Sequence, residues 1–258
     1  MSTIRLYVQA PLAVGAAVQL DEARAHYLSR VMRRVEGDRV ELFDGQSGAF
    51  GGRIASVGKR SATIELDTQL RPMPGTRSAP VLFQAVIKRP RFEWLVEKAT
   101  ELDVGCIVPV RTRRVSNPLG RLERLHAIAI EAAEQSGRLD VPAVIEEVPL
   151  AAIGAHRRRG VPLLVLDPTA PALAAELAGS VDGDLDLLVG PEGGLAPEDE
   201  HAIGSMETVW RGRIAPTILR AETAAVAGLA ASAMFRCSGL RLAESPSVSS
   251  VESVQNPR

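Results

Sequence analysis

The sequence predicts an α/β protein in which a small N-terminal β-barrel precedes a larger domain built on a parallel sheet. Two observations predict the larger domain. Short apolar runs alternate with helical patterns from about residue 81 onward, as in chains that wind a parallel sheet. Two of these runs, at 185–189 and 218–219, end abruptly at tight polar turns. Because open α/β sheets bind ligands at the carboxyl ends of their strands, we expect the site at that edge.

The first 72 residues contain four apolar runs separated by turn signals. We expect a helix from about Asp21 to Arg34, in which Leu28 and Val31 pack inward at helical spacing. The apolar runs predict strands at Ile4–Val8, Arg39–Phe43, Ala49–Ile54 and Ala62–Leu66. Together these elements predict a β-barrel domain at residues 1–72.

A stiff segment with two prolines and a glycine, at 71–75, predicts the domain boundary, so the second domain is expected at residues 76–243. Apolar residues at helical spacing predict helices over 92–102 and 122–137, and further helices that begin at Pro197 and Glu222. Apolar runs predict strands at Val81–Ile87, Cys106–Val110, Leu163–Leu166, Leu185–Val189 and Thr208–Trp210. The polar segment 244–258 is expected to be a disordered tail.

The composition narrows the class of function. The formal net charge is −1, so a nucleic-acid partner would have to be bound by a local basic patch. The 3% of aromatic residues argues against a base-stacking platform. The two cysteines, Cys106 and Cys237, show neither metal-ligand spacing nor a disulfide framework, which favours a reducing compartment. No apolar run is long enough for a signal-peptide core or a bilayer span, so we expect a soluble cytoplasmic protein.

The turn Gly190-Pro191-Glu192-Gly193-Gly194 follows the apolar run at 185–189. Glycines in such a turn allow the backbone to pass close to a ligand and expose its N–H and C=O groups. The turn has neither the Lys-Ser/Thr of a P-loop nor the G-x-G-x-x-G pattern of dinucleotide-binding proteins. By itself, a turn of this kind is more often structural than ligand-binding.

A second turn places Arg220 and Glu222 at the end of an otherwise apolar segment. Such charged residues are costly to bury unless they pair with each other or bind a ligand. One interpretation is an intramolecular salt bridge with a helix cap, in which the helix dipole favours Glu222. The other interpretation is a ligand site, and the residues alone leave both open.

Basic residues follow two successive predicted strands, with Lys88 after the first and Arg113 and Arg114 after the second. A solvated charged face is the usual explanation, but together with Arg30 and Arg33 the set is suited to a phosphate backbone. The four histidines are scattered, so the sequence indicates neither a metal cluster nor a Ser-His-Asp site.

Taken together, the segments Leu188–Leu195 and Ile218–Ala224 resemble the bacterial RsmE family, the 16S ribosomal RNA (uracil-N3)-methyltransferases. The resemblance covers about residues 5–236, and its motifs are specific as a set although each is weak alone. Further matching segments are His26–Leu28, Val31–Arg33, Gly37–Asp38, Leu42–Gly45, Lys98–Leu102, Ile107–Pro109, Arg113–Val115 and Glu131–Arg138.

This resemblance implies a SPOUT-class methyltransferase that works as a homodimer. Its α/β domain would contain a C-terminal trefoil knot, and its PUA-like barrel would help to hold RNA. The resemblance also implies S-adenosylmethionine as the methyl donor, no metal, and one uridine N3 in the 16S rRNA of the 30S subunit, near the decoding site, as the acceptor. The cofactor-binding residues that it implies are Leu166, Gly190, Pro191, Glu192, Gly193, Ile214, Ala215, Ile218, Leu219 and Thr223.

The implied reaction gives roles to the two charged residues of the second turn. Uracil N3 carries a proton and is a poor nucleophile, so it has to be deprotonated or hydrogen-bonded as it attacks the methyl group. Our hypothesis is that Arg220 stabilises the developing uracil anion or a neighbouring phosphate, while Glu222 orients Arg220 or takes the proton. The residues expected to contact RNA are Arg30, Arg33, Lys88, Arg113, Arg114 and Arg138.

The chain departs from the family pattern in the loop expected to enclose the cofactor. Ala215 stands where the family usually has glycine, and Thr217 where it usually has arginine. Alanine tolerates most backbone conformations except positive φ. One alternative is therefore a non-catalytic RNA-binding or ribosome-assembly protein of the same fold, and another is a SPOUT methyltransferase for a different RNA. The joint presence of Glu192, Arg220 and Glu222 favours an active enzyme.

Overall fold

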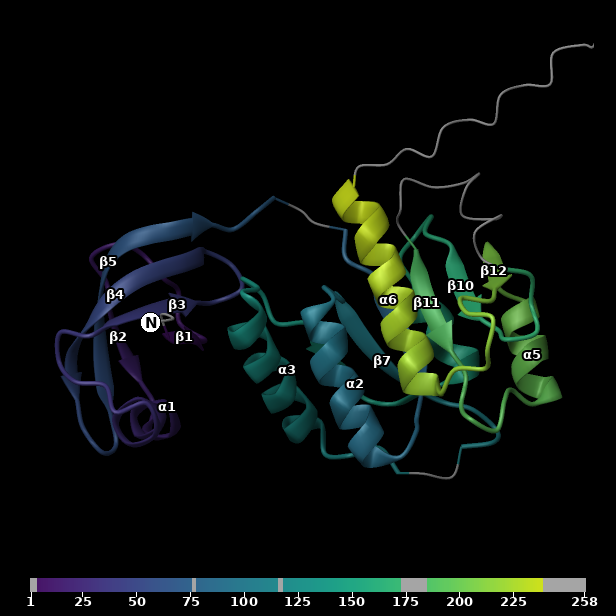
Figure 1. The fold of residues 1–258 in the computed structure, drawn as a ribbon, viewed down its shortest axis with the longest axis horizontal. Helices are drawn as coiled ribbons and strands as arrows, with labels where there is room; N and C mark the ends of the chain where they lie inside the picture. The colour runs from purple at the N-terminus through teal and green to yellow at the C-terminus, as the bar shows by residue number, and fades with distance from the viewer. Residues whose placement is uncertain (1–3, 76–77, 116–117, 173–184, 239–258) are drawn as a thin grey trace, which may run out of the picture.

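The computed structural model describes residues 4–75, 78–115, 118–172 and 185–238, and it shows two lobes side by side (Figure 1). The N-terminal lobe is a β domain, and the C-terminal lobe is a parallel sheet covered by helices. This arrangement confirms the predicted α/β class, in which a small β domain is N-terminal to the parallel-sheet domain. The domain limits 1–72 and 76–243 and the trefoil knot stay predictions, and the tail 244–258 lies outside the described residues.

Five strands form a mixed sheet in the N-terminal lobe, in the order β1-β3-β4-β5-β2. β1 runs parallel to β3, and the other neighbours are antiparallel. The edge strand β2 is absent from the predicted strands because only two of its four side chains are buried. The bounds are β1 Ile4–Tyr7, β2 Ala17–Leu20, β3 Arg39–Phe43, β4 Gly48–Val57 and β5 Ala62–Pro72.

The predicted helix of this lobe consists of two short pieces. α1 (Glu22–His26) continues directly as the π-helical turn η1 (Tyr27–Val31). A π turn closes i→i+5 hydrogen bonds, so side chains beyond it rotate away from α-helical spacing. Leu28 is buried as predicted, but Val31 is 59% exposed, so the prediction that Val31 packs inward is wrong.

The sheet of the C-terminal lobe is parallel throughout, in the order β12-β10-β11-β6-β7-β8, with β9 paired to the far end of β7. β6 to β8 extend to one side of the sheet, and β10 to β12 fill the other side, so the strand order reverses between them. The bounds are β6 Val81–Ala85, β7 Cys106–Arg111, β8 Ala143–Val144, β9 Val148–Pro149, β10 Leu163–Leu166, β11 Asp186–Val189 and β12 Val209–Gly212.

Helices cover both faces of this sheet (Figure 1). One face packs under α2 (Arg89–Glu101), α3 (Leu122–Ser136) and α6 (Ala221–Ser238), around a core that includes Leu82, Ile107 and Leu187. The other face packs against the 3-10 helix η2 (Leu150–His156) and α5 (Pro197–Gly204). Continuous apolar strands such as β10 follow from this burial on two faces.

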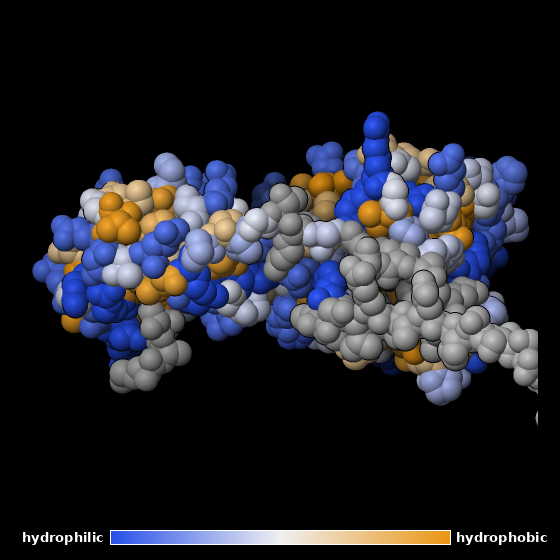
Figure 2. Space-filling model, turned by 90° about the horizontal axis from the view of Figure 1, so that it is seen from above, coloured by the Kyte–Doolittle hydropathy of each residue, from blue (hydrophilic) through white to orange (hydrophobic). Residues whose placement is uncertain are grey.

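The surface is largely hydrophilic on both lobes when seen from above, with apolar side chains in small groups between (Figure 2). Within the described ranges, no helix combines the length and the apolar character that a bilayer span requires.

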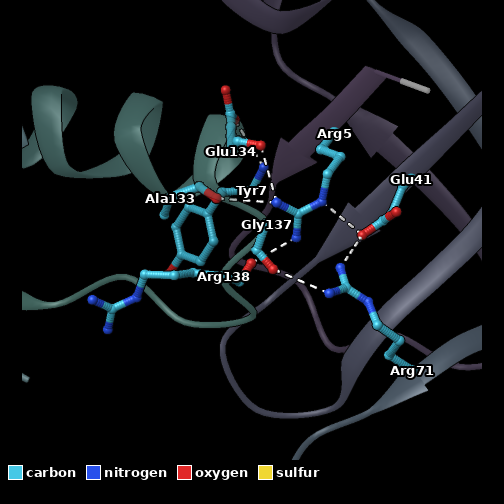
Figure 3. Close-up of polar contacts among 8 residues, drawn as sticks. All are labelled: Arg5, Tyr7, Glu41, Arg71, Ala133, Glu134, Gly137 and Arg138. Atoms are coloured by element: carbon cyan, nitrogen blue, oxygen red, sulfur yellow. Dashed lines mark hydrogen bonds and ion pairs between the residues drawn. The ribbon is translucent and has the colours of Figure 1, made fainter. Parts of the chain in front are cut away.

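The end of α3 meets the N-terminal lobe. The helix ends at Gly137, whose φ of 81° is a left-handed conformation that glycine adopts at low cost. Arg5 on β1 donates from Nη1 to the backbone oxygens of Ala133 at 3.1 Å and Glu134 at 3.0 Å, and from Nη2 to that of Arg138 at 2.6 Å (Figure 3). One arginine therefore satisfies carbonyl groups that a helix end leaves without partners.

A second arginine and a carboxylate complete this contact (Figure 3). Glu41 on β3 accepts from Arg5 Nε and from Arg71 Nη2, each at 2.7 Å. Arg71 Nη1 also donates to the Gly137 oxygen at 3.1 Å. Phe43 lies beneath, with the Arg5 guanidinium 4.7 Å from its ring centre. The two lobes are thus joined by a directional polar contact with a small apolar cluster beside it.

Candidate functional site

A cavity of about 340 Å³ opens at the carboxyl edge of the parallel sheet. Its walls are the segments that follow β10, β11 and β12, together with the first turns of α6. These three strands are neighbours, and parallel strands bring their carboxyl ends to one edge, so turns far apart in sequence meet here. The cavity therefore lies at the edge that the sequence predicts.

Most residues expected to bind the cofactor line this cavity. Gly193 and Thr223 are not among the lining residues, which instead include their neighbours Gly194 and Ala224. Those that line it are Leu166, Gly190, Pro191, Glu192, Ile214, Ala215, Ile218 and Leu219.

The loop that departs from the family pattern forms part of the cavity wall. Ala215 and Thr217 both line it. Among the described residues other than glycine, positive φ occurs only at Arg33, Asp103 and Thr208. Ala215 thus stands in a conformation that alanine adopts without strain.

Charged residues also line the cavity, among them Asp167 at the strand end that the resemblance implies as part of the cofactor cradle. Asp167 follows β10 and accepts from the Thr169 backbone N–H at 2.8 Å and the Thr169 hydroxyl at 2.7 Å. Arg211 Nη1 lies 3.4 Å from its other oxygen. Burial alone would raise the pKa of Asp167, but the Thr169 hydrogen bonds and Arg211 together hold that pKa below its usual range. The sequence signal for Asp167 is its place directly after an apolar run.

Two arginines from different strand ends hold the glycine-rich turn. Arg91, which follows β6, donates from Nη1 to Glu192 Oε1 at 2.7 Å. Arg114, which follows β7, donates from Nη1 to the Gly193 backbone oxygen at 2.8 Å. The turn is therefore fixed by side chains about 80 to 100 residues away in sequence, which no local pattern predicts.

Glu222 is buried in the first turn of α6, with 9% of its side chain exposed. Its Oε1 lies 3.5 Å from Arg91 Nε, and its Oε2 has no hydrogen-bond partner among the described residues. Arg220 is exposed, and the ion pair of Glu222 in the described part of the chain is with Arg91. Neither Arg220 nor Glu222 is among the residues that line the cavity, and their catalytic roles stay predictions. A buried carboxylate with one unsatisfied oxygen can accept a proton or hydrogen bond from a ligand.

Comparison with known proteins gives the family. A model described as RNA methyltransferase domain matches residues 77–233, and one described as RNA methyltransferase PUA domain matches residues 20–67. A ribosomal RNA small subunit methyltransferase E of Rickettsia conorii is 30% identical over 234 residues, which cover 88% of this chain and 93% of that protein. The chain belongs to the RsmE family.

Solved structures agree with this assignment. A Legionella pneumophila protein in complex with the bound cofactor S-adenosylmethionine has a TM-score of 0.80 at 25% identity, with 92% of this chain and 98% of that chain covered. An RsmE protein of Neisseria gonorrhoeae bound to S-adenosyl methionine has a TM-score of 0.77 at 27% identity, with 89% and 96% covered.

The basic residues expected from the RsmE resemblance to contact RNA fall into two groups. Arg30, Arg33, Lys88, Arg113 and Arg114 are exposed. The guanidinium of Arg138 points into the protein instead: its side chain is 5% exposed and donates from Nη1 to two backbone oxygens, those of residues 100 and 104, at 3.0 and 2.8 Å. This burial argues against the prediction that Arg138 contacts RNA, because its donors already hold the ends of two segments of the fold.

A search of the described residues finds no group of three or more His, Cys, Asp or Glu side chains that could hold a metal ion.

Proposed function

We propose that this chain methylates N3 of one uridine in the 16S ribosomal RNA of the small subunit, near the decoding site, with S-adenosylmethionine as the methyl donor. The observation that carries the proposal is the cavity at the carboxyl edge, which Arg91 joins to the buried carboxylate of Glu222. Membership of the RsmE family and the cofactor bound in two similar structures support it.

The cavity suits this cofactor in size. Its volume of about 340 Å³ lies within the range of small-molecule sites, roughly 300 to 1,000 Å³. Its wall combines apolar side chains such as Leu166 and Leu219 with the carboxylates of Asp167 and Glu192. Arg211 and Arg213 also line the cavity. Asp167 and Glu192 are paired with Arg211 and Arg91, so the lining carries charges of both signs. When bound, the cofactor supplies an activated methyl group, and the residues around it bind and orient it.

Glu222 and Arg220 then act on the base. Glu222 Oε2 accepts the N3–H of uracil as N3 attacks, which raises the electron density on that nitrogen. Negative charge develops on the uracil ring as the proton leaves, and the exposed guanidinium of Arg220 at the start of α6 stabilises it or an adjacent phosphate. A target nitrogen that carries a proton explains why a carboxylate belongs in the site, since a nitrogen with a free lone pair would need no base.

RNA has to present the uridine unpaired, because N3 lies on the Watson–Crick edge. Arg30, Arg33, Lys88, Arg113 and Arg114 would hold the surrounding phosphates from both lobes. A homodimer would bury the exposed apolar side chains of α6 and its preceding loop, such as Met234, which is 62% exposed. We place the enzyme in the cytoplasm, where ribosomal subunits are assembled.

The two alternatives remain distinguishable. A non-catalytic RNA-binding protein of the same fold would bind RNA without the cofactor, but the unstrained Ala215 and the open cavity favour the enzyme. A methyltransferase for another RNA would bind the cofactor and leave 16S ribosomal RNA unmodified.

The test combines binding with turnover. Isothermal titration with S-adenosylmethionine should give saturable binding near one site per subunit. Methyl transfer to small-subunit particles should fall by about 10² to 10⁴ in Glu222→Gln, because a positioned proton acceptor contributes on that order. It should fall by about 10² in Arg220→Ala, because a charge-stabilising donor is lost. A folded protein that binds RNA and not the cofactor would contradict the proposal, and so would full activity of Glu222→Gln.

A further inference from the structure

Arg91 joins two carboxylates that reach the site from different strand ends. It lies in the first turn of α2, directly after β6. Its Nη1 donates to Glu192 Oε1 at 2.7 Å, and its Nε lies 3.5 Å from Glu222 Oε1. Glu192 belongs to the glycine-rich turn and lines the cavity, whereas Glu222 belongs to the first turn of α6. One guanidinium therefore connects the wall of the cavity to the carboxylate that faces the base in the proposed reaction.

The two carboxylates depend on Arg91 to different extents. The side chain of Glu192 is 39% exposed, so water can replace the guanidinium there. Glu222 is buried, and its position is set by the polar contacts that it makes inside the protein. Within the described residues, Glu222 forms one ion pair, which joins its Oε1 to Arg91 and does not involve its Oε2. The pair leaves Oε2 buried and without a hydrogen-bond partner among the described residues, so a base can reach it only when the residues that cover it move.

The backbone that carries the Arg91 guanidinium is rigid. Pro90 restricts the backbone in the first turn of α2, and the next residue after Arg91, Phe92, is buried in the core together with Leu95. The glycine-rich turn, in contrast, has a second restraint that does not involve Glu222, because Arg114 donates to the Gly193 oxygen. Loss of Arg91 would therefore free Glu222 more than it would free the turn.

We propose that Arg91 is a positioning residue of the methyl-transfer reaction, which holds the Glu222 carboxylate at a fixed place relative to the cofactor-side turn and keeps Oε2 available to the uracil N3–H. This inference rests on the proposed function. A misplacement of about 1 Å can cost on the order of 100-fold in rate, so Arg91→Ala should lower kcat by about 10- to 100-fold. Affinity for S-adenosylmethionine should stay close to that of the wild type, because Arg114 still holds the turn.

A double-mutant cycle tests this role. The value of kcat for small-subunit particles, at saturating cofactor and RNA, is measured for the wild type, Arg91→Ala, Glu222→Gln and the double variant. If Arg91 acts through Glu222, Arg91→Ala lowers kcat in the wild type and adds nothing in the Glu222→Gln background. Arg91→Lys keeps the charge but cannot present a guanidinium fork to two carboxylates, so it should recover only part of the rate.

Matched variants separate this role from the simpler ones. Arg89→Ala, on the same helix, breaks a 2.7 Å pair with Glu93 and should keep the wild-type kcat. Glu192→Gln weakens only the contact between Arg91 and the glycine-rich turn, so it should lower kcat less than Arg91→Ala does. Arg91→Ala should lower the midpoint of thermal unfolding more than Arg89→Ala does, because it leaves the buried Glu222 carboxylate unpaired whereas the Arg89–Glu93 pair is partly exposed, so kcat is compared at a temperature at which both variants are folded.

Three results would overturn the inference. An equal loss of kcat from Arg91→Ala in both backgrounds would show that Arg91 acts independently of Glu222. A loss in Glu192→Gln as large as that in Arg91→Ala would assign the effect to the turn. A wild-type protein that binds the cofactor but does not methylate the particles would overturn the proposed function and this inference with it.

Discussion

Arg5→Ala should weaken the contact between the two lobes more than the substitution of any single exposed residue would. The guanidinium makes four hydrogen bonds, at 2.6 to 3.1 Å, to Glu41 and to three carbonyl oxygens at the end of α3. Its side chain is only 12% exposed, as is that of Glu41, so water does not replace these contacts without rearrangement. Removing one member of a buried ion pair costs about 3 to 5 kcal/mol, and we expect a loss of stability in this range.

Arg71→Ala is the matched control. Arg71 contacts the same carboxylate and the same helix end, through Glu41 and the Gly137 oxygen, but its side chain is 46% exposed. Its loss should therefore cost about 1 kcal/mol or less. Arg5 differs from Arg71 both in its burial and in making four hydrogen bonds where Arg71 makes two, so the larger effect reflects the two together.

Urea unfolding followed by two probes measures both effects. The two tryptophans, Trp94 and Trp210, both lie in the C-terminal lobe, so their fluorescence follows that lobe, whereas far-UV circular dichroism follows the whole chain. In Arg5→Ala the circular dichroism transition should begin at lower urea than the fluorescence transition, because the β domain loses its neighbour. A loss of stability in Arg5→Ala no greater than that in Arg71→Ala would refute the reasoning.

Three further changes have defined outcomes. A Cβ added at Gly228 would lie 2.9 Å from Leu166 Cδ1 and 3.2 Å from Leu187 Cδ1, and alanine gains about 1 kcal/mol over glycine inside a helix, so Gly228→Ala should lower stability by about 0 to 2 kcal/mol, measured by thermal unfolding. Burial raises the pKa of Glu134, so the contribution of this carboxyl to stability is greatest below its unfolded pKa and is lost as pH rises through its folded pKa. Glu134→Gln does not titrate, so its stability relative to the wild type should rise as pH increases above the ordinary glutamate pKa of about 4, measured by urea unfolding. Replacing Arg30 and Arg33 by glutamine should flatten the slope of log affinity for RNA against log salt concentration by about 1.5, measured by fluorescence anisotropy.

Each of these outcomes can fail in a specific way. A higher midpoint of thermal unfolding for Gly228→Ala would mean that α6 can move away from β10 at little cost. A stability difference for Glu134→Gln that shrinks as pH rises would contradict a raised pKa at Glu134. An unchanged salt slope would show that Arg30 and Arg33 do not contact phosphates.

The strands were predictable where burial leaves a continuous apolar run. β3 and β10 have the bounds expected from the sequence, residue for residue. The π turn after α1 was not predictable, because Leu28 and Val31 fit ordinary α-helical spacing and only the change to i→i+5 hydrogen bonds turns Val31 toward solvent. β2 is a short edge strand whose alternation over four residues is too brief to stand out.

The cavity wall was predictable because its residues directly follow apolar runs or belong to two recognisable turns. The contacts around it were not predictable in the same way. Arg91 and Glu192 are 101 positions apart, and only the order of strands in the sheet brings them together. The family resemblance led us to expect Arg138 to contact RNA, yet backbone carbonyls at the end of α2 give it a buried position.

The identity of the modified nucleoside is the most direct test of the central claim. Small-subunit particles from cells that lack this modification are incubated with the purified protein and methyl-labelled S-adenosylmethionine, and the 16S ribosomal RNA is digested and mapped by mass spectrometry. The account predicts one labelled 3-methyluridine near the decoding site, absent with Glu222→Gln. A label on a ribose, on another base or on another RNA would contradict it.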